Sequence, residues 1–436
     1  MKDINKGLLN FIKESPSPFQ AVESIESILN KNGFKYLKES DAWKITNGRF
    51  YTVRNNSSII AFDIPNKIND YHFQVCASHT DSPTFKIKCE SELNGPNEYL
   101  KLNVEKYGGG INYTWFDKPL SVAGRLLVKD KNKTIAKNLY IDEDILIIPS
   151  MPIHMNRNVN AGQEFNVQVD LCPMFSNGEL KKGDFVKILA KYANVKTQDI
   201  IGYDLYLVNR QDGKLWGYKK EFISSGKLDD LQAAYTSLIG FVDSKDNGSI
   251  KVYCAFDNEE VGSETKQGAM STFLKDTLLR INNALKKNED NYHQATAKSF
   301  MVSFDNAHAV HPNHPEKYDA ENRCYMNKGI VIKENAAQSY TTDSFSRAIF
   351  KDICLSAKVP VQNFANRSDE RGGGTLGNIS NTQVSLHAVD IGLPQLAMHS
   401  NYETAGSKDS EYAYNAIKEY YSRNIKIEDS LSYTIK

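Results

Sequence analysis

The chain has few of the features that mark membrane or secreted proteins. None of its apolar runs approaches the ~18 residues that a membrane-spanning helix needs. The first 15 residues are interrupted by Lys, Asp and Glu, so they contain no apolar core of the signal-peptide type. The 6 cysteines occur singly, without a Cys-x-x-Cys pair, which argues against a disulfide framework and a cysteine-ligated structural zinc. We therefore expect a cytoplasmic protein that does not enter a membrane.

An excess of charge of either sign is also missing. The 53 basic residues balance the 53 acidic ones, and no long basic block interrupts the sequence. Such a chain lacks the electrostatic footprint of a protein that binds nucleic acid or an anionic membrane. We therefore expect no nucleic-acid partner. The 436 residues, 40% of them hydrophobic, suffice for two domains or for one large domain with an insertion.

The pattern of apolar runs predicts an α/β protein with a β-rich insertion. We expect helices at about 8–12, 18–31, 228–241, 269–285, 342–357 and 411–422, and buried strands at 73–78, 250–256, 299–304 and 395–398. Between about 92 and 224 the sequence consists of short runs in which apolar and polar residues alternate, separated by turn residues. We expect strands there at 100–104, 126–128, 145–148, 165–169 and 204–208. This predicts a catalytic domain in two parts, 1–91 and 225–436, around a separate module at 92–224. Ordinary continuation of one domain is the alternative.

Residue types that bind metal ions follow four of the apolar runs. His79 follows one run, Glu259 and Glu260 follow a second, and Asp305 and His399 follow two others. Because the carboxyl ends of strands meet at one rim of an open α/β sheet, we expect these side chains to lie close together. Taken alone, each has a common alternative as a solvated surface residue, a loop residue or a turn cap. Their joint occurrence favours a metal site.

The number of candidate ligands favours two metal ions. Two histidines and three carboxylates are too many for one tetrahedral zinc: His79, Asp229, Glu260, Asp305 and His399. If Asp229 bridges, each metal receives one imidazole, one further carboxylate and a share of the bridge. Ordinary charge at the start of a helix is the alternative for Asp229. Glu259 remains free to act as a general base beside a ligand. Asp81, two residues after His79 on the same side of an extended segment, can accept the second imidazole N–H.

At these residues the sequence resembles the aspartyl aminopeptidase family of two-zinc exopeptidases. The resemblance covers nearly the whole chain, in the family's order, at Ala77–Pro83, Trp115–Leu120, Lys227–Leu231, Asp257–Ser263, Asp305–Asn313 and Pro394–Ser400. It implies a zinc-exopeptidase-like fold, in which helices flank a mixed central sheet and the β-rich insertion is a dimerisation domain. It further implies a metalloaminopeptidase that acts on peptides, binds two divalent ions (zinc, with cobalt or manganese as alternatives) and assembles into dimers and dodecamers.

The resemblance assigns the same roles to the candidate site residues. It makes His79, Asp229, Glu260, Asp305 and His399 the metal ligands, with Asp229 as the bridge. Glu259 is the catalytic base and Asp81 lies behind the first histidine. The resemblance also implies a cis peptide bond between Asp229 and Asp230. His154 matches a histidine that reaches from the insertion into a neighbouring subunit's active site.

Substrate preference is the point on which the resemblance leaves alternatives. Lys333 matches a lysine placed for an acidic substrate side chain, which would favour Asp or Glu at a peptide's N-terminus; an exposed lysine at a strand end is the other interpretation. The glycine-rich loop 371–377, centred on Gly374, lets the backbone approach the substrate. This loop lacks the Cys and Pro of acid-specific members, so a broad or neutral preference stays open. Two rival functions are a two-metal N-acyl amino acid deacylase and a non-catalytic cage with a structural metal.

Overall fold

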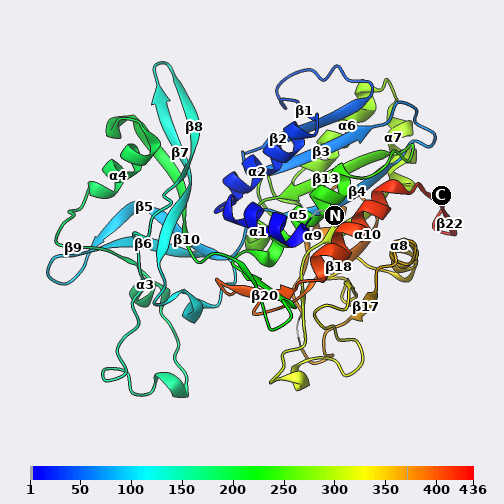
Figure 1. Cartoon of the computed structure of the whole chain (residues 1–436). Coiled ribbons are helices and arrows are strands. Elements are labelled where there is room, and N and C mark those ends of the chain that lie inside the picture. The colour runs from blue at the N-terminus through cyan, green and yellow to red at the C-terminus, as the bar shows by residue number, and fades with distance from the viewer. Residues whose placement is uncertain (1–2, 371) are drawn as a thin grey trace.

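Nine strands form one mixed sheet through the larger lobe of the molecule (Figure 1). The computed structural model describes residues 3–370 and 372–436. The strand order is β1-β2-β3-β13-β4-β14-β18-β16-β17. Strands β13, β4, β14 and β18 run parallel to one another, whereas β3 and β16 are antiparallel to their neighbours β13 and β18. The strands are β1 (Lys35–Tyr36), β2 (Gly48–Arg54), β3 (Ser58–Ile64), β4 (Phe73–His79), β13 (Ile250–Phe256), β14 (Phe300–Phe304), β16 (Ile330–Lys333), β17 (Val361–Phe364) and β18 (His387–Gly392). The predicted mixed sheet is confirmed.

Helices cover both faces of this sheet, and each face has its own apolar core. Alternate residues of β13 point to opposite sides, with Tyr253 and Ala255 in one core and Val252 and Cys254 in the other. Because both faces are covered, the central strand is buried along its whole length and reads as a continuous apolar run. The first core packs against α1 (Ile4–Lys13), α2 (Pro18–Lys31), α5 (Leu228–Val242), α8 (Ser344–Ser356) and α10 (Asp409–Ser422); the second packs against α6 (Phe273–Ala284), α7 (Glu289–Ala297) and α9 (Leu376–Asn381).

A second lobe is built on a six-stranded antiparallel sheet, seen at the left of Figure 1. Its strand order is β8-β7-β10-β5-β6-β9, and its own core includes Leu102, Val122 and Leu205. Its elements are β5 (Thr84–Asn94), β6 (Tyr99–Tyr107), β7 (Leu120–Asp130), β8 (Lys133–Tyr140), α3 (Val167–Asp170), β9 (Met174–Asn177), α4 (Asp184–Ala193) and β10 (Ile200–Asn209). The division at residues 92 and 224 into a separate domain stays a prediction.

Two strands expected in this lobe are absent from its described residues. Segment 145–148 forms only isolated bridges, through Leu146 and Ile147. Segment 165–169 contains the start of α3, because the side chain of Asn166 accepts hydrogen bonds from the backbone N–H groups of Gln168 and Val169. This N-terminal cap stabilises a helical turn despite the alternating pattern.

A third sheet connects the two lobes and was not expected. Its order is β11-β12-β20-β19-β15, with β11 (Lys214–Trp216), β12 (Phe222–Ser225), β15 (Ala307–His308), β19 (Pro394–Leu396) and β20 (Glu403–Gly406). The strand predicted at 395–398 thus ends at Leu396, and His399 lies in the turn before β20. A hairpin of β21 (Ile425–Glu428) and β22 (Ser432–Ile435) follows α10. Within residues 3–370 and 372–436, no helix combines the length and apolarity needed to cross a membrane.

Candidate metal centre

The predicted ligands come together at the carboxyl ends of the parallel strands. His79 is the last residue of β4, and its register partner Phe256 ends β13, just before the 3₁₀ turn Glu259–Val261. Asp305 follows β14 directly. Asp229 enters from the first turn of α5, and the Asp229–Asp230 peptide bond is cis, as the family resemblance implies.

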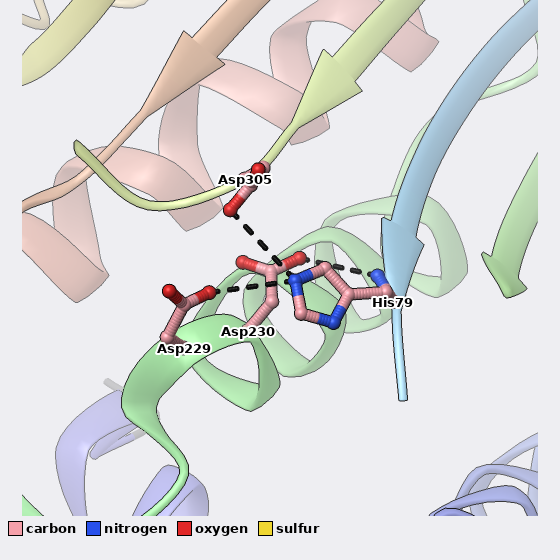
Figure 2. A group of neighbouring side chains, drawn as sticks. All are labelled: His79, Asp229, Asp230 and Asp305. Atoms are coloured by element: carbon pink, nitrogen blue, oxygen red, sulfur yellow. Dashed lines mark hydrogen bonds and ion pairs between the residues drawn. The ribbon is translucent and has the colours of Figure 1, made fainter. Parts of the chain in front are cut away.

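His79 presents one ring nitrogen to two carboxylates and the other to Asp81. Its Nε2 lies 3.4 Å from Asp229 Oδ1 and 3.8 Å from Asp305 Oδ1, as Figure 2 shows. Its Nδ1 lies 3.1 Å from the carbonyl oxygen of Asp81 and 3.3 Å from the carboxylate Oδ1 of the same residue. The backbone N–H of His79 donates to Asp230 Oδ2. An Nδ1–H held by Asp81 leaves Nε2 as the nitrogen available for a metal ion.

His399 faces a second group of carboxylates around the same aspartate. Its Nε2 lies 3.6 Å from Asp229 Oδ2 and 3.4 Å from Glu260 Oε2. Its Nδ1 lies 3.3 Å from the carbonyl oxygen of Gly109, which belongs to the glycine run after β6. The two carboxylate oxygens of Asp229 therefore face two different histidines. This arrangement is the one expected of a carboxylate that bridges two metal positions.

The donor set fits divalent cations. At this site, three buried carboxylate oxygens lack a hydrogen-bond partner: Asp229 Oδ1, Asp230 Oδ1 and Glu260 Oε1. Buried anionic oxygens without partners are costly unless a cation neutralises them. Ligand atoms of His79, Asp229, Asp230 and Asp305 lie within 4.8 Å of one another, as do those of Asp229, Glu260 and His399. Imidazole with carboxylate is a donor combination that suits zinc.

The pKa values of Glu259, Glu260 and His399 are all raised in this buried site with closely spaced carboxylates. Burial raises the pKa of Glu259 to about 8, and the nearby Asp305 and Asp81 carboxylates add to this effect. Burial also raises the pKa of Glu260 well above its ordinary value, with Asp229 contributing. For His399, burial by itself would lower the pKa, but the hydrogen bond to Asp229 and the charge of Glu260 outweigh it and raise the pKa to about 10. The metal-free centre therefore holds protons that bound cations would displace.

Asp81 organises the turn that carries the two glutamates. Its Oδ1 accepts the backbone N–H of Glu259 at 3.1 Å, and its Oδ2 accepts that of Glu260 at 3.2 Å. The phenol of Tyr107, the last residue of β6, donates to Oδ2 at 2.8 Å. One carboxylate thus contacts the imidazole of His79, the glutamate turn and the second lobe.

Three residues of the site were not anticipated. Asp230 is buried behind Asp229 and accepts from the backbone of His79. Glu403, the first residue of β20, accepts the backbone N–H of Asp229 through Oε2 and that of His399 through Oε1. Tyr107 reaches the site from the other lobe. Only Asp230 stands beside a predicted ligand in the sequence, so the sequence has no local signal for the other two.

One predicted substrate-binding residue, Lys333, contacts a candidate ligand, because its Nζ lies 3.8 Å from Asp305 Oδ2. His154 is exposed in a loop of the second lobe, next to Met155, which is 76% exposed. Gly374 lines a cavity of about 910 Å³ together with Thr342 and Asn366; Arg371 of the same loop lies outside the described residues. Lys333 is buried at the end of β16, where its ammonium donates to the carbonyl oxygens of Asp305 at 2.8 Å and Asn306 at 3.2 Å.

Comparisons with known proteins agree over almost the full length. The family model described as aminopeptidase I zinc metalloprotease (M18) matches residues 11–421. The chain is 46% identical over 422 residues to a probable M18 family aminopeptidase 2 of Clostridium novyi, covering 95% of this chain and 98% of that protein. It is 36% identical over 453 residues to aspartyl aminopeptidase 1 of Schizosaccharomyces pombe, covering 97% and 95%. The solved mApe1 dodecamer of Saccharomyces cerevisiae has a chain with a TM-score of 0.85 and 27% identity, with 96% of each chain covered.

Proposed function

The chain belongs to the M18 family of zinc metalloaminopeptidases, and on that premise we propose that it releases the N-terminal residue of peptides at a two-metal centre. His79, Asp229 and Asp305 hold one ion, and His399, Asp229 and Glu260 hold the other. The single observation that carries this proposal is the division of the Asp229 oxygens between two histidines. When bound, zinc supplies Lewis acidity, which makes a carbonyl more electrophilic and water more nucleophilic.

Glu259 moves the proton in this proposal. Its carboxylate stands beside the ligand Glu260 on a turn that Asp81 fixes through two backbone N–H groups. It takes a proton from the attacking water and later delivers it to the leaving amine. Asp81 keeps the His79 imidazole oriented during this transfer.

A preference for N-terminal Asp or Glu is the finer proposal. The name of the Schizosaccharomyces pombe relative supports it. In this proposal the ammonium of Lys333 binds the carboxylate of the substrate's N-terminal side chain, and the backbone around Gly374 forms one wall of the pocket for that side chain. The second candidate is a broad or neutral preference. One observation favours this alternative, because Lys333 is only 2% exposed and its ammonium already donates to two carbonyl oxygens.

Self-association is proposed through the predicted insertion, residues 92–224, which forms most of the second lobe. The dodecamer of the similar Saccharomyces cerevisiae protein supports assembly. Exposed apolar side chains flank His154 in the sequence, namely Met151, Ile153 and Met155. A partner subunit that covers these side chains brings His154 into the neighbouring active site. A cytoplasmic location is also proposed, and the six free cysteines, all within the described residues, support it.

Turnover on a panel of aminoacyl amides tests the proposal. The zinc-loaded protein should hydrolyse at least one of the Asp-, Glu-, Leu- and Lys-amides, with cobalt and manganese as comparison metals. Glu259→Gln should keep its metal content, because Glu259 is not a ligand, and should lose about 10²–10⁴-fold in turnover. Near-wild-type turnover in Glu259→Gln would refute the base. Hydrolysis of N-acyl amino acids instead of aminoacyl amides would contradict the aminopeptidase activity itself.

A further inference from the structure

The second lobe contributes one buried hydroxyl to the metal centre. Tyr107 ends β6, a strand whose other apolar residues, such as Leu102 and Val104, pack in the core of that lobe. Tyr107 itself points the other way and is only 8% exposed. Its hydroxyl oxygen lies 2.8 Å from Asp81 Oδ2 and 2.9 Å from Asn258 Nδ2. The phenol therefore sits between the residue behind His79 and the residue before Glu259.

The surrounding network sets the direction of the Tyr107 hydrogen bond. Asn258 Oδ1 accepts from Thr265 Oγ1 at 2.8 Å and from Gln267 Nε2 at 2.7 Å, so the amide nitrogen of Asn258 must face Tyr107. That nitrogen donates to the phenol oxygen, which leaves the phenol proton for Asp81. A neutral hydroxyl that donates to a carboxylate makes a charge-assisted bond, which is stronger than a bond between neutral groups.

Asp81 depends on this bond because its two oxygens serve four donors. Oδ1 faces Glu259 N at 3.1 Å and His79 Nδ1 at 3.3 Å. Oδ2 faces Glu260 N at 3.2 Å and the Tyr107 hydroxyl at 2.8 Å, the shortest of the four distances. Without the phenol, the carboxylate loses its closest donor and a restraint on its rotation. Rotation of the Asp81 carboxylate would release the turn that carries Glu259 and would leave His79 Nδ1 with the Asp81 carbonyl oxygen as its acceptor.

We propose that Tyr107 is a positioning residue that holds Asp81 in the orientation that aligns Glu259 with His79. This inference rests on the proposed function, because it assigns the effect to the general base. Through Tyr107, the second lobe would help to position the catalytic residues, in addition to its proposed role in self-association. Because Tyr107 acts through Asp81, its removal should slow the chemical step and leave substrate binding largely unchanged.

Tyr206 offers a matched control on the same sheet. It lies on β10 and is also 8% exposed, and its ring meets that of Tyr107 edge-on with centroids 5.4 Å apart. Tyr107→Phe and Tyr206→Phe each remove one hydroxyl from the same aromatic cluster, which also contains Phe19. Only Tyr107→Phe removes a donor to Asp81. Both variants keep the ring contact between the two lobes, so a loss of kcat confined to Tyr107→Phe would not come from ring packing.

The experiment compares kcat, KM, zinc content and melting temperature of these variants, with kcat expressed per folded, zinc-loaded subunit. Tyr107→Phe should lose about 10- to 100-fold in kcat with KM within about twofold of wild type, whereas Tyr206→Phe should keep wild-type kcat. A double-mutant cycle with Asp81→Asn gives the second measurement. Because Tyr107 acts through Asp81, Tyr107→Phe should change kcat less than about twofold in the Asp81→Asn background.

Two results would overturn the inference. One is a Tyr107→Phe enzyme with the kcat of Tyr206→Phe, and the other is full additivity with Asp81→Asn. These results are distinct from failure of the proposed function, which would appear as wild-type turnover that survives Glu259→Gln. The cycle remains decisive if Tyr107→Phe is less stable, because a stability loss shared by both backgrounds cancels from the comparison.

Discussion

Replacement of Glu403 by glutamine should weaken zinc binding, although it changes none of the proposed ligands. Glu403 is 1% exposed and holds two backbone segments together. Its Oε2 accepts the N–H of Asp229 at 3.0 Å, and its Oε1 accepts the N–H of His399 at 2.8 Å. The two segments lie 174 and 4 residues away from Glu403 in the chain. The carboxylate therefore ties the backbone of Asp229 to that of His399.

The size of the effect follows from these two bonds. The amide oxygen of the introduced glutamine can accept one N–H, but its NH₂ group then faces the other N–H as donor against donor. One buried backbone N–H thus loses its acceptor, at a cost of about 1–3 kcal/mol. If that cost falls on the geometry of the centre, zinc affinity decreases by about 10- to 100-fold, the range typical for groups that orient metal ligands.

Zinc content under a graded series of chelator concentrations measures this loss, and the melting temperature with and without zinc measures its link to folding. Thr404→Val is the matched control, because Thr404 is the next residue on β20 and its hydroxyl lies 2.7 Å from Ser224 Oγ, away from the ligands. Thr404→Val should retain wild-type zinc affinity. A Glu403→Gln protein that binds zinc as tightly as both wild type and Thr404→Val would refute the reasoning.

Two further outcomes are expected from the charges at the site. Zinc added to the metal-free protein at pH 7 should release protons, because the pKa of His399 is raised to about 10 and its imidazole must lose a proton to bind the metal. For the same reason, zinc affinity should increase with pH up to about pH 10. Titration in unbuffered solution should count about one proton fewer per subunit in His399→Ala; an unchanged count would speak against His399 as a ligand. Lys333→Met should lower kcat/KM on Asp-amide by about tenfold more than on Leu-amide, as expected for a lost charged hydrogen bond. Equal losses on both amides would instead mean that Lys333 acts by supporting Asp305, through its carboxylate and carbonyl oxygens, and Asn306.

The grouping of the candidate ligands could be anticipated from the sequence because buried parallel strands are continuous apolar runs that end abruptly. His79 and Asp305 follow such runs directly, and the rim of the sheet brings them together. The supporting residues had no comparable signal. A carboxylate such as Glu403, which accepts backbone N–H groups from distant segments, has no periodic pattern around it. In the sequence Tyr107 looks like an ordinary residue of a strand whose side chains point alternately to its two faces. Only the placement of the two lobes brings its hydroxyl to Asp81.

Local capping and short strands account for the errors in the fold. The alternation at 165–169 is typical of a strand, but the side chain of Asn166 stabilises the first turn of α3 instead. The sheet between the lobes consists of pieces as short as β15 and β19, with two and three residues. Pieces of that length pair only because tertiary contacts align them, so neither propensity nor periodicity identifies them.

The order of the strands in the sheet has a consequence for the stage of synthesis at which the metal centre can form. The central strands β4 and β13 are neighbours in space, yet the whole second lobe is synthesised between them. The ligand positions run from His79 to His399, which lies near the end of the chain. A nascent chain that stops before His399 lacks one imidazole of the centre and the Glu403 carboxylate behind it. With the proposed ligand set, metal loading and peptidase activity would follow completion of nearly the entire polypeptide, and truncated products of translation would not become active peptidases.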